Sequence, residues 1–443
     1  MLSIPQSKRP RQPPRPPTVA DSPPDDGTDL MTILPNYLIE EILSRLPIDD
    51  AVRTSTLAKS WYNRWAKCPE LQLQFFADDP PVAVDSVLSG YKCSISKFEL
   101  HVMRESMGNS DGWLYTLATK GVRSLKLYFV PIHFWDIAVV PPSLFSCSEL
   151  TSLELQFWEI PHVPSSFQGF SNLTELQLYE VRFPKNGVSI LEALINMAPL
   201  LSDLGIIFPD IQANDDGHYD EWVIRAPKLK IIDIKLGEDY GWHIDHLPLL
   251  EEAYVDLEGP QLARMLSGMT RVKKLYIDFT GNTVLEKLPS YFMELKDLSF
   301  RTVFTSSPRI LAIFCILRNA LNLEYLHITV LHEGDERDEV DIDFLNAQWI
   351  AGLFSKLKYF KLSAIMGQSN EMQFIEFVLS KAAKLQNIEV SVHDDSSKSM
   401  EVVSSELSNY RKAFPQTEVI INQFTGYYID ETNDEEIQIN DYQ

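Results

Sequence analysis

A six-residue hydrophobic pattern that recurs twelve times along the chain is the feature that most constrains its fold. The pattern is LxxLxL, with Leu, Ile, Val, Phe or once Ala at the marked places. Successive copies begin 27, 28, 23, 28, 28, 21, 22, 23, 28, 34 and 28 residues apart. The copies begin at residues 95, 122, 150, 173, 201, 229, 250, 272, 295, 323, 357 and 385.

Each copy alternates apolar and polar residues, which is typical of a half-buried strand. The stretches between copies carry helical patterns, such as "SILEALINMAPL" from residue 189 and "PRILAIFCILRNA" from residue 308. Most intervals lie within the roughly 20 to 29 residues of a leucine-rich repeat. One repeat cannot bury its own leucines, but stacked repeats can. We therefore predict an α/β fold in which residues 93–350 form a curved solenoid with a parallel sheet on its concave face.

The polar places of each copy predict which side chains face the concave side. The marked residues point into the core, so the residue between the last two and the residue just after them project outward. We predict that four tyrosines and one arginine form a continuous stripe that binds a partner, because this composition is typical of interface hot spots; they are Tyr128, Tyr179, Tyr254, Tyr276 and Arg301. Tyrosine is also simply a favourable strand residue. The other outward places hold Glu154, Gln156, Gln177, Lys235, Asp256, Asp278, His327 and Lys361.

Composition restricts the class of partner. The chain has 443 residues, of which 45% are hydrophobic and 23% charged, as in globular proteins. Its net charge of −23 argues against nucleic acid and against an anionic membrane surface. The longest apolar run, "ILAIFCIL" at 310–317, is too short to cross a bilayer and indicates a buried helix. The N-terminus lacks the apolar segment of a signal peptide.

The sequence contains no recognisable catalytic or metal motif. Cys68, Cys93, Cys147 and Cys315 have no CxxC spacing, which favours reduced, buried thiols over disulfides or zinc ligands. The sequence lacks GxGxxG, GxxxxGK[ST], HExxH and GxSxG. "HIDH" at 243–246 fits a polar loop better than a metal site, since no further Cys or His is close by. We predict no catalytic residue, no cofactor and no metal.

Three segments are expected to be solvated. Residues 1–30 are rich in Pro, Asp and Ser, and their "KRPRQPPR" cluster is either a nuclear import signal or a flexible arm. The acidic run "EGDERDEVDID" at 333–343 falls in the longest interval, so we expect an insertion on one rim of the solenoid. Residues 425–443 form an acidic tail.

Residues 31–75 have a different pattern, that of a small helical unit. Apolar residues recur at helical spacing from Leu38 to Leu46, between the helix-bounding Pro35 and Pro47. Asp49 or Asp50 is expected to cap a second helix. A third helix is expected from about residue 57 to 67, with tryptophans at i and i+4 on one face. So small a unit buries only a small core, which leaves apolar surface for a partner.

This unit resembles the F-box in its plant form. The resemblance is carried by Leu34, Pro35, Leu38, Ile39, Ile42, Leu43, Ser44, Leu46, Pro47, Asp50, Ala51, Val52, Arg53, Thr54, Ser55, Leu57, Trp61 and Trp65. In that family the F-box binds the Skp-type adaptor of a cullin-RING ubiquitin ligase, and the repeats capture a substrate. The resemblance implies that adaptor contacts are made by Leu34, Pro35, Leu38, Ile39, Ile42, Leu43, Leu46, Pro47, Val52, Leu57 and Trp61.

Residues 351–424 are similar to the FBD region that closes many plant F-box proteins with leucine-rich repeats. The central glycine of that region is present as Gly367. Its closing pattern is matched by Arg411, Ala413, Pro415, Glu418, Val419 and Ile420. The resemblances together imply a non-catalytic substrate receptor of an SCF-type ligase in the nucleus and/or cytoplasm. The alternatives are an interaction scaffold without a ligase and, less favoured on this acidic array, a small-molecule sensor.

Overall fold

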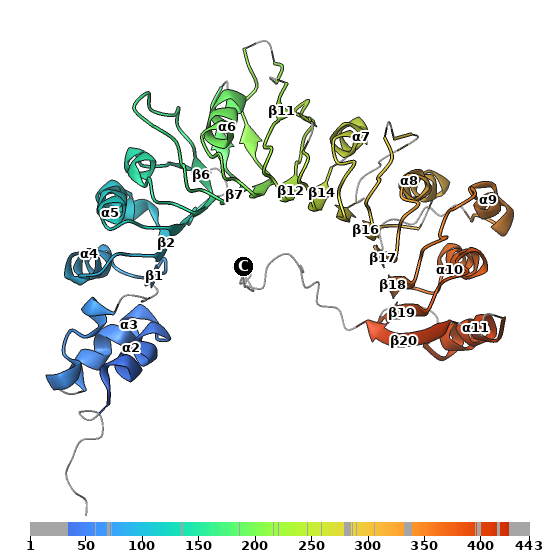
Figure 1. The fold of residues 1–443 in the computed structure, drawn as a ribbon, viewed down its shortest axis with the longest axis horizontal. Coiled ribbons are helices and arrows are strands. Elements are labelled where there is room, and N and C mark those ends of the chain that lie inside the picture. The colour runs from blue at the N-terminus through green and yellow to red at the C-terminus, as the bar shows by residue number, and fades with distance from the viewer. Residues whose placement is uncertain are drawn as a thin grey trace, which may run out of the picture.

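The computed structural model describes residues 34–424, apart from 58, 69–70, 72, 134–135, 186, 216, 220, 246, 258, 279–284, 286, 289, 305, 332–338, 395, 397–399 and 414–416. The predicted tails at 1–30 and 425–443, and most of the acidic run, lie outside the described residues. The described chain forms an arc that begins at a small helical unit (Figure 1).

A 14-stranded parallel sheet lines the inner side of the arc (Figure 1). Its strands, in spatial order, are β1 (Leu73–Phe75), β2 (Lys97–Val102), β3 (Ser124–Phe129), β5 (Ser152–Gln156), β7 (Glu175–Tyr179), β9 (Asp203–Ile207), β12 (Ile231–Lys235), β14 (Glu252–Asp256), β15 (Lys274–Asp278), β16 (Asp297–Thr302), β17 (Tyr325–Val330), β18 (Tyr359–Ile365), β19 (Asn387–His393) and β20 (Glu418–Phe424). Every copy of the hydrophobic pattern is one of these strands. The predicted α/β solenoid with a concave parallel sheet is therefore confirmed.

Helices and short extended segments cover the outer side of the arc. The helices are α4 (Pro81–Gly90), α5 (Met107–Thr119), α6 (Gly187–Asn196), α7 (Gly259–Ser267), α8 (Ser307–Arg318), α9 (Ile342–Ala347), α10 (Ser369–Lys381) and α11 (Met400–Ala413). The short strands form one four-stranded sheet, made of β4 (Ala138–Val139), β6 (Trp158–Glu159), β8 (Arg182–Phe183) and β10 (Asp210–Ile211), and one pair, made of β11 (Val223–Ile224) and β13 (His243–Ile244). The apolar run at 310–317 lies in α8 and is largely buried, as predicted.

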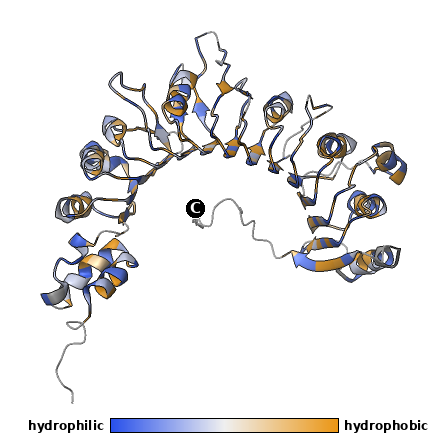
Figure 2. Ribbon diagram, viewed as in Figure 1, coloured by the Kyte–Doolittle hydropathy of each residue, from blue (hydrophilic) through white to orange (hydrophobic). Residues whose placement is uncertain are grey.

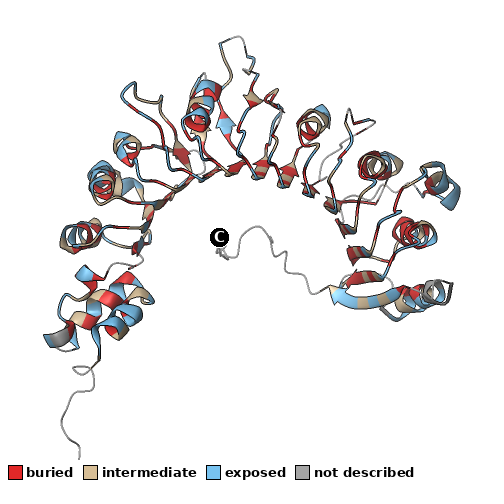
Figure 3. Ribbon diagram, in the orientation of Figure 1, coloured by how far each residue is buried: buried red, intermediate tan, exposed pale blue. Residues whose placement is uncertain are grey.

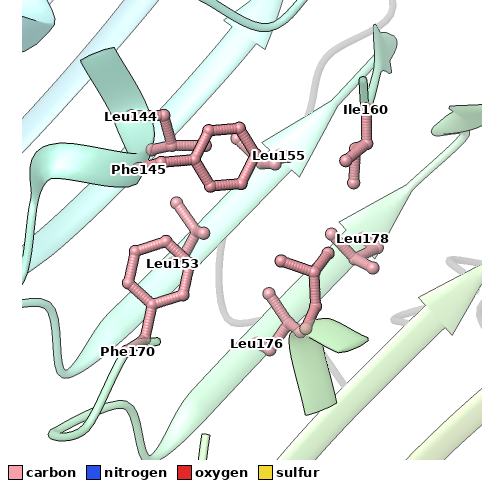
Figure 4. A pocket seen from close by; sticks show the side chains of 9 residues that line it. Leu144, Phe145, Leu153, Leu155, Ile160, Phe170, Leu176 and Leu178 are labelled. Atoms are coloured by element: carbon pink, nitrogen blue, oxygen red, sulfur yellow. The ribbon is translucent and has the colours of Figure 1, made fainter. Parts of the chain in front are cut away.

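The core lies between the sheet and this outer layer, and it is closely packed. Figure 2 and Figure 3 show apolar, buried residues alternating along the strands. In Figure 4 the side chains of Leu153, Leu155, Leu176 and Leu178 point toward the outer segments. The gap between them measures about 10 Å³, which is no larger than the space one water needs. It is a packing gap and not a ligand site.

Three neighbouring strands end in the same unusual corner. Phe157, Glu180 and Phe208 directly follow β5, β7 and β9 and have φ angles of 60°, 49° and 47°. The Phe208 N–H donates to the Lys235 carbonyl at 2.7 Å, and the other two corners bond to the next strand in the same way. Left-handed backbone costs a non-glycine residue about 1 kcal/mol or more. The corners turn the chain out of the main sheet into the four-stranded outer sheet.

The N-terminal unit confirms two predicted helices and corrects the third. α2 (Asn36–Ser44) and α3 (Ile48–Arg53) are present. Instead of a continuous third helix the chain forms 3-10 turns, η1 (Thr54–Thr56), η2 (Lys59–Trp61) and η3 (Trp65–Lys67). The interruption falls at Asn63, whose φ of 53° lies in the left-handed region that asparagine tolerates.

The predicted cap of the second helix is also wrong by a short distance. Pro47 occupies the N-cap position, and Asp49 and Asp50 lie within the first turn. At that place the positive end of the helix dipole stabilises the two carboxylates, although neither side chain caps the helix.

The strand leucines generate the first prediction. Leu153, Leu176, Leu275 and Leu326 are each at most 2% exposed. Replacing any of them with Ala should lower the free energy of unfolding by about 2 to 5 kcal/mol, because each change leaves a cavity. Urea titration followed by circular dichroism measures this. Ser152→Ala, one place away on the outward side of β5, should change little. Wild-type stability of all the leucine variants would contradict the assigned register.

Candidate protein-binding surfaces

The proposed adaptor-binding residues fall into two groups by burial. Ile39, Leu43 and Trp61 are 2%, 0% and 1% exposed and belong to the core of the N-terminal unit. These side chains are therefore not available to a partner in this structure, and their inclusion in the contact set is revised. They hold the shape of the unit from within.

The remaining candidates lie at or near the surface. Ile42 is 40% exposed and Leu57 is 56% exposed. Pro35 and Pro47 are exposed, and half-buried positions are held by Leu34, Leu38, Leu46 and Val52. Tyr37 and Tyr62, which the sequence pattern did not single out, are 68% and 69% exposed. Large apolar side chains on so small a unit form a surface that fits a protein partner.

The N-terminal unit is fastened to the first repeat. The Lys92 N–H donates to the Ala66 carbonyl at 2.7 Å, and the Tyr91 hydroxyl donates to the Cys68 carbonyl at 2.5 Å. Burial, with smaller effects from nearby thiols, raises the pKa of Tyr91 to about 12, so the hydroxyl keeps its proton and donates. A Cβ on Gly90 would lie 3.1 Å from the Trp65 ring, which leaves room only for glycine without adjustment. The junction is thus closely packed.

The concave face carries three outward rows of side chains along the strands, and the strand register assigns each candidate to a row. Tyr254 and Tyr276 are neighbours in the middle row, with ring centroids 6.1 Å apart. Tyr128, Tyr179 and Arg301 lie in the row nearest the strand ends. The predicted single stripe on successive strands is therefore wrong. Strands β5, β9 and β12 intervene, and only Tyr254, Tyr276 and Arg301 lie close together.

The row nearest the strand beginnings was missed by the sequence analysis. It contains Tyr325 and Tyr359, whose rings stack with centroids 4.8 Å apart and an interplanar angle of 2°. They are 43% and 38% exposed. The residue before the second marked place of LxxLxL also alternates outward, so the strand pattern itself contained this signal.

Two further outward residues are held by hydrogen bonds. The Tyr128 hydroxyl donates to Glu154 Oε1 at 2.6 Å, and its ring lies 4.6 Å from that of His101. His327 is hydrogen-bonded to the Ser363 hydroxyl at 3.0 Å. Burial lowers the pKa of His327 to about 4, so the imidazole is neutral near pH 7. These side chains are parts of fixed networks within the sheet face.

An acidic group of side chains lies on β7, β9 and β14. Burial and the neighbouring charge of Glu175 raise the pKa of Asp203 to about 6, although Gln177 donates a hydrogen bond to it at 2.9 Å. A Cβ on Gly205 would lie 1.8 Å from the Gln177 side-chain oxygen, so a larger residue there would displace the Gln177 amide from Asp203. The negative charge of Asp203 therefore destabilises the folded state at neutral pH.

A pocket of about 190 Å³ opens on the concave face at β12 to β16. It is lined by Phe208, Lys235, Tyr254, Val255, Asp256, Tyr276, Asp278 and Arg301. Arg301 Nη1 lies 3.0 Å from Asp278 Oδ2, and the Asp278 side chain is only 6% exposed. Three of the five predicted partner-binding residues thus line one hollow, whereas Tyr128 and Tyr179 do not.

The cysteines and histidines of the described chain show no metal-binding arrangement. Cys68, Cys147 and Cys315 are buried and Cys93 is half-buried, and all are free thiols. Burial raises the pKa of Cys147 to about 12, which makes it inert as a nucleophile. His243 lies in β13, and His246 is outside the described residues. Among the residues that the structure describes, no three His, Cys, Asp or Glu side chains gather to hold a metal ion. None of the described helices has the length and apolarity to cross a membrane.

Comparison with known proteins identifies the class. The F-box domain family matches residues 31–73, and the leucine-rich repeats of the family described as FBD-associated F-box protein At5g56370 match residues 110–258. The chain is thus a leucine-rich-repeat protein with an N-terminal F-box.

The curated relatives refine this class. The chain is 26% identical to the F-box/FBD/LRR-repeat protein At1g13570 of Arabidopsis thaliana, over 90% of this chain and 99% of that protein. It is 23% identical to the FBD-associated F-box protein At5g60610 of Arabidopsis thaliana, over 82% of this chain and 100% of that protein. The chain is therefore similar, over most of its length, to plant F-box/leucine-rich-repeat proteins that carry an FBD region. A solved leucine-rich-repeat protein of Leptospira interrogans aligns over 81% of this chain and 91% of that chain, with 13% identity and a TM-score of 0.31.

The raised pKa of Asp203 predicts how the stability of the fold depends on pH. The pKa of Asp203 rises from 3.8 to about 6 on folding, so the folded state binds its proton more tightly than the unfolded state. The resulting loss of stability is absent below the unfolded pKa of 3.8, grows as the pH rises from there to the folded pKa of about 6, and is complete above it. Asp203→Asn, which can still accept the Gln177 hydrogen bond, should therefore melt higher than wild type at pH 7.5, by a margin that shrinks toward pH 4.

The measurement is the melting temperature of both proteins across this pH range. Asp78→Asn, a change at an exposed carboxylate, is the matched control and should follow the wild-type profile. A constant offset between Asp203→Asn and wild type at every pH would contradict the assigned cause.

Proposed function

We propose that the protein is a non-catalytic substrate receptor of an SCF-type ubiquitin ligase. The observation that carries the proposal is the arrangement of the F-box and the array. A small helical unit with exposed apolar side chains, including Ile42 and Leu57, is fastened to one end of a solenoid. The solenoid offers a separate concave face of polar and aromatic side chains.

In this proposal the F-box docks on the Skp-type adaptor, which in turn joins a cullin. The exposed group of F-box side chains makes the contact, and Ile39, Leu43 and Trp61 support it from beneath. The concave sheet face then binds the substrate protein. The packed junction at Tyr91 would keep substrate and adaptor at a defined separation. Such a receptor would act in the nucleus and/or cytoplasm.

The second function considered, a scaffold without a ligase, makes a different prediction for copurification. A scaffold would bring down array-bound proteins without adaptor or cullin. The exposed Tyr37 and Tyr62 favour the receptor, because an unpartnered F-box that presents such side chains is a liability for solubility.

The exposed F-box residues generate a direct test. Ile42→Asp combined with Leu57→Asp should weaken capture of a purified plant Skp-type adaptor by about tenfold or more, since losing a central apolar anchor usually costs about 2 kcal/mol. The melting temperature should stay near wild type, because both side chains are at the surface. Binding to surface-immobilised adaptor measures capture, and calorimetry measures the melting temperature.

Two controls complete this test. Val82→Asp changes a 71% exposed side chain on α4, outside the F-box, and should leave adaptor capture unchanged. Leu43→Ala should instead destabilise the F-box by about 2 to 5 kcal/mol, because the residue is fully buried. If the double variant binds adaptor as wild type does while folding normally, the receptor proposal is wrong.

A further inference from the structure

The two edges of the concave sheet are protected to different degrees. The first strand, β1, is only three residues long, and the F-box covers that end of the array (Figure 1). The last strand, β20, has seven residues, no proline and a single charged residue, Glu418, and its register with β19 runs without a bulge. Short strands, prolines, charges, bulges and covering elements are the means by which proteins keep a sheet edge from pairing with another chain. The edge at β20 has few of them.

The backbone of β20 has hydrogen-bonding groups on its outer side. The Glu418 N–H points to β19 and donates to the Gln386 carbonyl at 2.7 Å. Backbone N–H groups alternate in direction along a strand, so those of Val419, Ile421 and Gln423 point away from β19. Among the residues that the structure describes, β20 pairs with β19 alone. The outer edge therefore offers a row of backbone donors and acceptors.

The core side of β20 shows which side chains an added strand would need there. Val419 and Ile421 pack against the core of the array but are only half-buried. Their neighbours on β19, Ile388 and Val390, are fully buried, because β20 lies beside them. An apolar residue beside Val419 and another beside Ile421 would complete the last layer of the core in the same way.

The concave side of β20 favours a positive charge. Glu418 lies at the surface and accepts a hydrogen bond from Asn387 Nδ2 at 2.9 Å. Within the described part of the chain, no cation forms an ion pair with this carboxylate. Opposite charges on adjacent strands stabilise a sheet, so a Lys or Arg beside Glu418 is favoured. The net charge of −23 also attracts a basic segment, whereas it opposes the pairing of two copies of the chain.

We propose that the outer edge of β20 is a docking site for an extended basic segment of a protein partner, which joins the sheet as an additional antiparallel strand. Backbone hydrogen bonds to Val419, Ile421 and Gln423 hold the segment. Its apolar residues pack beside Val419 and Ile421, and a Lys or Arg pairs with Glu418. Antiparallel pairing is the more stable of the two possible directions. The edge lies at the opposite end of the array from the F-box, so the inference does not depend on the ligase role (Figure 1).

The test measures binding of full-length protein to a dye-labelled peptide, Gly-Ser-Thr-Thr-Val-Thr-Val-Lys-Gly-Ser, by fluorescence anisotropy. Antiparallel to β20, this peptide places its valines beside Ile421 and Val419 and its lysine beside Glu418. Wild-type protein should bind it about tenfold or more tightly than two altered peptides. One altered peptide has glutamate in place of the lysine. The other has proline in place of the first valine, which removes a backbone donor that faces Ile421.

Protein variants locate the site. Ile421→Pro should abolish binding, because proline is tolerated at an edge position whose N–H points outward but cannot donate. Ile421→Ala, the matched control, loses the same side chain but keeps the N–H, so it should bind within about fivefold of wild type. Glu418→Lys should reverse the preference between the lysine and glutamate peptides. Asp78→Lys makes the same change of charge just after β1, near the other edge, and should leave the preference intact.

Two further measurements separate lost binding from lost folding and show where the peptide lies. Melting curves are recorded for every variant, and if Ile421→Pro melts lower than Ile421→Ala, Gln423→Pro is compared with Gln423→Ala in its place. In hydrogen exchange, the amides of Val419 and Ile421 should exchange more slowly when the wild-type protein binds the peptide.

Several results would overturn the inference. They are equal binding or no binding of the three peptides, and binding that survives the proline change in the protein. Another is protection of the Val419 and Ile421 amides without peptide, because a second copy or another part of the chain would then cover the edge. Sedimentation equilibrium distinguishes these two coverings.

Discussion

The fold depends on the stacking of strand leucines between neighbouring repeats. Leu125, Leu153 and Leu176 occupy equivalent places on adjacent strands and are at most 2% exposed, so each repeat completes the core of the next. The same stacking sets the curvature. Strands lie about 4.8 Å apart, whereas a helix is about 10 Å wide, so helices on the outside spread that side and bend the sheet inward. The concave face is therefore a consequence of the core.

The F-box depends on this core in a different way. It contributes β1 to the edge of the sheet, where Leu73 pairs with Phe98, and it closes the first repeat through Tyr91 and Trp65. Its own small core leaves Ile42 and Leu57 at the surface. One unit thus caps the solenoid, which every repeat array needs, and retains apolar surface for another protein.

The sequence predicted the strands because it combines two patterns: apolar residues alternate within each copy, and the copies recur about every 25 residues. Few folds other than a repeat solenoid show both patterns. It failed where local backbone conformation decided the outcome. Trp61 and Trp65 have helical spacing, but Asn63 between them is left-handed, so no helix forms. The pocket was beyond prediction for a related reason. It needs the lateral register of β12 to β16 and the left-handed corner at Phe208, and neither is encoded within a single repeat.

The pocket lies among the shortest repeats of the array. The intervals of 21, 22 and 23 residues that begin at 229, 250 and 272 are the shortest consecutive ones in the chain. Between β12 and β14 the outer segment is the two-residue strand β13 and not a helix. Rings and charges line one hollow there because Tyr254, Tyr276 and Arg301 lie on the consecutive strands β14, β15 and β16. Tyr128 and Tyr179 lie on β3 and β7, farther along the sheet, and do not reach it.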